Sequence, residues 1–182
     1  MARKLLLPAT ELMVQYARYH RDRRNIATHM IGVPMILFGL GVLLARGQLP
    51  PGGGSGLTLA WLACAAGTLW YLSRGHLLLG LTASLGNVLI VALAHLASAG
   101  TVARWLGWGL GFFVAGWIVQ SIGHWYEGRK PALADDLRGL LVGPMFVAAE
   151  LLFALGLAQP LQREIERRAG PTLLRDLAHP VG

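Results

Sequence analysis

Apolar residues are gathered along this chain into long runs that short polar or basic segments separate. The runs cover residues 26–45, 57–73, 77–99, 105–122 and 140–158. Each is close to the roughly 20 residues with which a helix crosses a hydrocarbon core of about 30 Å. The pattern therefore predicts an all-α fold, a single integral membrane domain over residues 1–182 built as a helical bundle of four or five spans.

The segments between the runs also fit a helical bundle. The prolines and glycines of ARGQLPPGGGSG predict a loop after the first run. Only residues 74–76 separate the second run from the third, which predicts a tight helical hairpin. In the fifth run Gly143 and Pro144 interrupt the start and Glu150 lies in the middle. We therefore expect this run to form either a full span or a broken, re-entrant segment.

Two segments are predicted to lie outside the bilayer. Residues 10–21 follow Pro8 and carry apolar and aromatic side chains at helical spacing, which predicts an amphipathic helix on the membrane surface. Residues 159–182 contain QREIERR and predict a short charged helix followed by a tail. The basic start of the chain is followed by only three leucines before a proline, so we expect no secretory signal peptide.

Composition and charge agree with a membrane protein. Only 14% of the residues are charged and 54% are hydrophobic, whereas soluble domains carry about 25% charged residues. The net charge of +7 does not indicate nucleic-acid binding, because the basic residues gather at predicted membrane edges. They precede the first run and follow the fourth, at Arg18, Arg21, Arg23, Arg24, Arg129, Lys130 and Arg138.

The positive-inside rule places both of these basic edges on the cytoplasmic side, in the cell inner membrane if the source is bacterial. Four spans between the two edges agree with that orientation. The arginine-rich tail would lie on the opposite side if the fifth run crossed the membrane, so the rule leaves the course of that run open.

Three of the six histidines fall at this same edge. His29 lies in the first turn of the first run and His124 follows the fourth, so an even number of crossings puts both on one side. His20 lies nine residues before His29, and one continuous helix, at 100° per residue, would place them on opposite faces. We therefore expect the chain to turn between them, with Asp22 as turn residue and Asn25 as helix cap. An isolated histidine at a membrane edge is usually no ligand, but the convergence of three favours a metal site.

Two carboxylates are further candidates. Glu127 lies three residues after His124, so it shares a helix face with that histidine if the helix continues. It is a candidate metal ligand, and an ion pair with Arg129, Lys130 or an arginine of the first basic edge is the equal alternative. Glu150 is costly to bury in lipid and is therefore a candidate to support the site. We expect no ligand role for the remaining histidines, His76, His95 and His179.

Several classes of metal protein are excluded by spacing. The single cysteine, Cys64, excludes a disulfide framework and a cysteine-rich metal cluster. Successive histidines lie 9, 47, 19, 29 and 55 residues apart, which excludes the dense histidine boxes of membrane desaturases. Of the histidines, only His95 lies deep enough for a haem ligand, and a b-type haem needs two that face each other.

The segments HRDRRNIATHMIGVP and QSIGHWYEGRKPAL, and more weakly GPMFVAAELLF, resemble the membrane-bound 2-hydroxy fatty acid dioxygenase family. The resemblance extends from about Tyr16 to Leu155. It implies an Fe(II)-dependent enzyme that uses O2 to shorten a 2-hydroxy fatty acid by one carbon, with release of CO2. It also implies that the family's essential histidines fall on His20, His29 and His124.

A three-imidazole site suits iron and leaves positions for substrate and O2. A 2-hydroxy acid can chelate through its hydroxyl and carboxylate, while its tail lies in the bilayer beside the first or fourth run. Basic residues at the edge are candidates for the carboxylate, or are simply positive-inside markers. These candidates are Arg24, Arg129 and Lys130, and Asn25 joins Glu150 as a candidate to support the ligands.

The alternative function is a non-enzymatic membrane transporter or scaffold with a structural metal site. Asn87, His95 and Glu150 are polar residues within apolar runs, and such residues can line a transport path. This alternative does not explain why three histidines meet at one membrane edge.

Overall fold

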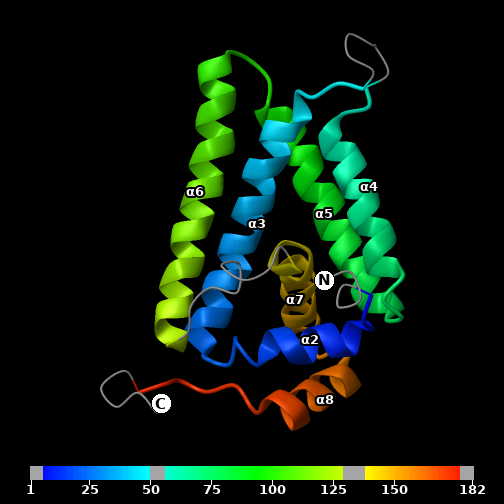
Figure 1. The fold of residues 1–182 in the computed structure, drawn as a ribbon, viewed down its shortest axis with the longest axis vertical. Helices are drawn as coiled ribbons and strands as arrows, with labels where there is room; N and C mark the ends of the chain where they lie inside the picture. The colour runs from blue at the N-terminus through cyan, green and yellow to red at the C-terminus, as the bar shows by residue number, and fades with distance from the viewer. Residues whose placement is uncertain (1–5, 50–55, 129–137, 177–182) are drawn as a thin grey trace.

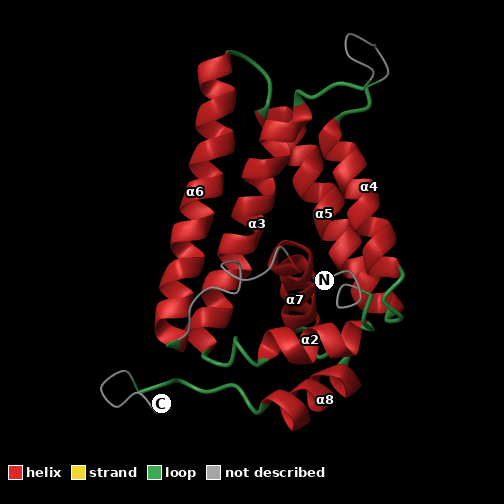
Figure 2. Ribbon diagram, viewed as in Figure 1, coloured by secondary structure: helices red, strands yellow, loops and turns green. Residues whose placement is uncertain are grey.

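The computed structural model describes residues 6–49, 56–128 and 138–176. Within these ranges every regular element is a helix, which confirms the all-α prediction (Figure 1, Figure 2). The helices are α2 (Ala9–Ala17), α3 (Arg23–Ala45), α4 (Leu59–Leu72), α5 (Leu77–Ala97), α6 (Val102–Glu127), α7 (Arg138–Ala154) and α8 (Gln159–Ala169).

Three of these helices, α3, α5 and α6, are long and apolar enough to cross a membrane. The second apolar run forms α4, which has 14 residues and is therefore only about 21 Å long at 1.5 Å per residue. The fifth run forms α7, which together with α8 makes a pair bent by 115°. The described residues thus hold three candidate spans, or four if the bent pair counts as one.

The bend after α7 has a local backbone cause. Gly156 and Ala158 have φ angles of 73° and 52°, both in the left-handed region, where the chain leaves a helix. Pro160 in the first turn of α8 then starts a new helix in another direction. Beyond α8 the chain pairs with the start of α3: the Leu173 N–H donates to the carbonyl of Arg21 at 2.9 Å. The helix of the fifth run therefore ends in a sharp bend, and the tail lies at the end of the bundle where α3 begins.

Glycines bring α3 and α6 into close contact, side by side over most of their length (Figure 1). A Cβ atom on Gly39 would lie 2.5 Å from the backbone nitrogen of Phe113, and one on Gly116 would lie 2.8 Å from the carbonyl oxygen of Gly32. Only glycine allows the two backbones to approach this closely. The packing fixes the first turns of α3 against the last turns of α6.

Helix α2 lies across one end of the bundle, next to α7 and α8 (Figure 1). Its apolar side chains, including Leu12 and Met13, are buried in a core that α7, α8 and α5 share. Glu11 and Arg168 form an ion pair that joins α2 to α8. The apolar face of this amphipathic helix is therefore covered by protein. The helix ends at Ala17 instead of residue 21, because the N–H groups of Tyr19 and His20 close a turn on Tyr16 and Ala17.

Candidate metal centre

The turn between α2 and α3 carries His20 and brings it toward His29. Asp22 caps α3, since its Oδ1 accepts a hydrogen bond from the Arg24 N–H at 2.8 Å. The prediction that Asn25 caps the helix is wrong, because Asn25 lies within the first turn of α3 and is buried. Burial alone would raise the pKa of the Asp22 carboxyl, but hydrogen bonds from Arg24 and the Arg175 backbone outweigh it and lower the pKa to about 2. The expected turn is therefore present, and α3 is capped by Asp22, the residue immediately before the helix.

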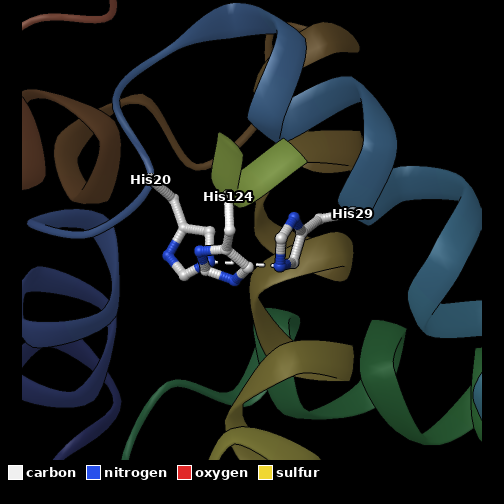
Figure 3. Close-up of side chains that lie close together, drawn as sticks. All are labelled: His20, His29 and His124. Atoms are coloured by element: carbon white, nitrogen blue, oxygen red, sulfur yellow. Dashed lines mark hydrogen bonds between the residues drawn. The ribbon is translucent and has the colours of Figure 1, made fainter. Parts of the chain in front are cut away.

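His20, His29 and His124 meet at this end of the bundle (Figure 3). His29 lies in the second turn of α3 and His124 in the last turn of α6, which ends at Gly128 in a left-handed conformation with φ of 67°. One ring nitrogen from each histidine lies within 4.8 Å of the other two. All three side chains are buried. The structure thus brings together the three histidines that the sequence singled out.

Hydrogen bonds to the backbone fix the tautomers of two rings. The Nδ1 of His20 lies 2.7 Å from the carbonyl oxygen of Tyr16, and the Nδ1 of His29 lies 2.9 Å from that of Asn25. A carbonyl only accepts, so both Nδ1 atoms carry the proton in the neutral rings. Both Nε2 atoms then present lone pairs, and they lie 3.1 Å apart (Figure 3).

Two lone pairs at this distance repel unless a proton or a cation lies between them. Burial, with a further contribution from the neighbouring His29, lowers the pKa of His20 well below its ordinary value, which disfavours an added proton. The Nδ1 of His124 is also buried without a hydrogen-bond partner in the described ranges. A divalent cation satisfies both features, so the three rings fit a metal ion that prefers imidazole.

Glu127 lies outside this three-histidine group. Its Oε2 accepts hydrogen bonds from the backbone N–H groups of Arg21 and Asp22, at 3.0 and 2.9 Å, and from the Asn25 amide at 3.1 Å. Its Oε1 lies 2.8 Å from the guanidinium of Arg175. Both oxygens of Glu127 are therefore engaged, and its ion-pair partner comes from the C-terminal tail.

Of the candidate residues for the substrate carboxylate, the structure describes Arg24, which lies at the same end. Arg24 donates to the two oxygens of Asp22, at 3.0 Å from Nε and 2.7 Å from Nη2, and its guanidinium stacks on Tyr126. Nη2 also donates to the carbonyl of Arg175 at 2.8 Å, and the side chain is 33% exposed. Arg129 and Lys130 fall outside the residues that the structure describes.

Glu150 does not belong to the three-histidine group. It lines a pocket of about 250 Å³ between α7 and α8, together with Arg21, Gln162 and Glu166. The remaining histidines have other surroundings: the Nε2 of His95 lies 2.9 Å from the Thr58 hydroxyl, and the Nδ1 of His76 accepts from the first turn of α5. His179 falls outside the described ranges.

Sequence reasoning missed two aromatic residues and one arginine at the centre. Tyr16 stacks on the His20 ring with centroids 4.1 Å apart, and Phe146 packs at 5.4 Å from the same ring. Two sequence features could have pointed to the aromatic residues. Tyr16 precedes His20 by four residues, which is one helical turn, and Phe146 lies in GPMFVAAELLF, the third segment that resembles the family. No sequence feature could have pointed to Arg175, because it lies 48 residues from Glu127 and no local pattern connects the two.

The fold and the site together define a helical membrane protein with a buried three-histidine centre at one end of its bundle. The chain belongs to the family described as 2-hydroxy-palmitic acid dioxygenase Mpo1-like, whose model matches residues 7–155. It is 33% identical over 153 residues to the 2-hydroxy-palmitic acid dioxygenase MPO1 of Saccharomyces cerevisiae, and the match covers 83% of each chain. No solved structure matches the chain significantly. The family resemblance is confirmed.

Proposed function

We propose that this protein is an Fe(II)-dependent dioxygenase that shortens long-chain 2-hydroxy fatty acids by one carbon. The reaction balances with one O2: the 2-hydroxy acid and O2 give the shorter acid, CO2 and water. The observation that carries the proposal is the buried group of three imidazoles in a chain of this dioxygenase family. Bound iron would supply open coordination positions and a route by which electrons pass from the 2-hydroxy acid, the reductant of the balanced reaction, to O2.

The residues of the chain prepare such a site in three ways. The carbonyls of Tyr16 and Asn25 hold the protons of His20 and His29 on Nδ1, so that both Nε2 lone pairs are available. Tyr16 and Phe146 pack against the His20 ring and keep water from it. The burial of His20 keeps the ring neutral, as a ligand must be.

The apolar surroundings suit a lipid substrate. A narrow crevice between α3, α6 and α7 begins one turn beyond His29, and Val33, Leu37, Trp117 and Leu140 are among its lining residues. The crevice encloses only about 10 Å³, which is too little for an acyl tail, so the tail is proposed to lie in the bilayer beside α3 or α6. There it gains about 0.8 kcal/mol for each CH2 that it buries. Its carboxylate would then lie at the basic edge, where Arg24, Arg129 and Lys130 remain the proposed contacts.

The transporter alternative has less support. His95 is bonded to Thr58 and stacked on Trp61 near the start of α4, whereas Glu150 lines a pocket beside α8. These elements lie at opposite ends of the bundle (Figure 1). His95 and Glu150, two of the polar residues that suggested a path, therefore have separate surroundings.

The test of the proposed function is a reconstituted turnover assay. The purified full chain, loaded with Fe(II), should convert a long-chain 2-hydroxy acid to the acid one carbon shorter and consume O2. Turnover should stop when a chelator removes the metal and when O2 is removed. Product that still forms with a chelator present and without O2 would reject the dioxygenase mechanism.

The orientation of the protein gives a separate prediction. We propose that the centre and the C-terminal tail both face the cytoplasm, because the first basic edge, with Arg21, Arg23 and Arg24, and the arginine-rich tail share one end of the bundle. In a Cys64→Ala background, Arg23→Cys and Asp176→Cys should then be labelled only after permeabilisation of right-side-out vesicles. Thr101→Cys, at the other end of α6, should be labelled in intact vesicles. Opposite labelling of Arg23→Cys and Asp176→Cys would show that the tail crosses to the other side.

A further inference from the structure

The C-terminal tail runs along the turn that carries His20. The Arg21 guanidinium donates to the Gly170 carbonyl at 2.8 Å, and the Arg23 N–H donates to the Leu173 carbonyl at 2.9 Å. The Arg175 N–H donates to Asp22 Oδ2 at 2.9 Å. With the bond from Leu173 N–H to Arg21, these contacts make the tail a short parallel neighbour of residues 21–23.

The same turn is held from its other side by α6. The Oε2 of Glu127 binds three donors of the turn, the N–H groups of Arg21 and Asp22 and the amide of Asn25. The Arg175 guanidinium then closes the arrangement on the Oε1 of Glu127. The Glu127 side chain is 0% exposed, so Arg175 supplies the positive side chain that balances a buried carboxylate.

We propose that Glu127 and Arg175 form a positioning pair, through which the C-terminal tail holds His20 in its metal-binding place. Glu127 is then no ligand: it fixes the turn one residue beyond His20, and Arg175 fixes Glu127. The inference rests on the three histidines binding a metal, which is part of the proposed function. Both α8 and Arg175 lie beyond the matched residues 7–155, so the family match does not assign this role.

Removing one partner should harm the site more than removing both. In Arg175→Gln the buried Glu127 carboxylate loses its counter-charge. In Glu127→Gln the new oxygen can accept from the turn, but the amide N–H2 then faces the donors of Arg175. In the double variant the two amides can bond to each other, and no unpaired charge is buried.

The experiment measures the affinity of the full chain for Co²⁺ by chelator competition, together with the Co²⁺ absorption bands, which report ligand type and geometry. Each single variant should bind Co²⁺ about 10- to 100-fold more weakly, the usual cost of losing a residue that orients metal ligands. The double variant should recover to within about threefold of the wild type, because the pair is coupled. Arg175→Lys, which keeps the charge, should lie between wild type and Arg175→Gln.

Arg163→Gln is the matched control, since it removes one arginine from the exposed face of α8, where the guanidinium donates to the side chain of Gln159 one turn earlier. It should bind Co²⁺ as the wild type does. Wild-type affinity in Arg175→Gln, or losses that simply add in the double variant, would overturn the positioning pair. Altered absorption bands in both Glu127→Gln and the double variant would show instead that Glu127 is a ligand. A wild-type chain that binds no divalent metal would overturn the metal site itself.

Discussion

Alanine at His20, His29 or His124 is expected to abolish turnover and to remove the metal, while the protein still inserts into the membrane. One nitrogen of each ring lies within 4.8 Å of the other two, so one ion would bind all three, and two imidazoles would hold it more weakly. The loss of metal affinity should exceed the roughly 10- to 100-fold cost of losing an orienting residue. Metal analysis of the purified variants and the turnover assay measure both effects.

Two other histidines provide the controls for this experiment. His76→Ala removes the cap of α5 and should cost about 1 kcal/mol of stability without affecting metal content. His179→Ala should leave both metal content and turnover nearly unchanged. Full activity in any of the three site variants would reject the assignment of that histidine. Zinc in the isolated protein would not contradict iron, because imidazole binds both, but activity restored by zinc alone would.

The second large effect concerns the substrate: the 2-hydroxyl group is expected to be indispensable. With three protein ligands on the metal, a 2-hydroxy carboxylate can occupy two positions as a five-membered chelate and leave one for O2. The unhydroxylated acid has no second donor, and a 3-hydroxy acid would form a larger ring. Neither should be turned over when product formation is measured at equal chain length.

Chain length supplies the control for the hydroxyl effect. All three acids bury the same apolar tail, so their partition into the membrane should be similar. A difference in turnover then reports on the metal site alone. Equal turnover of the unhydroxylated acid would show that the hydroxyl is no ligand, without excluding O2 chemistry at the same centre.

The course of the fifth apolar run shows where sequence reasoning reached its limit. Gly143, Pro144 and Glu150 indicated an irregular segment, but they left a full span and a broken one equally open. The break lies instead at residues 155–158, where Gly156 and Ala158 take left-handed conformations. The tail then returns to the start of α3, so its arginines share one end of the bundle with Arg21, Arg23 and Arg24.

The sequence by itself determined the helices, the end of the bundle that carries the site and the three histidines. Hydrophobic run length fixes where helices form in a membrane, and the parity of crossings fixes which helix ends meet. Tertiary structure alone decided which polar groups pair there. The partner of Glu127 is Arg175, and Phe146 packs on His20. Such contacts join segments far apart in the chain, and they depend on how α7, α8 and the tail pack, which no local periodicity records.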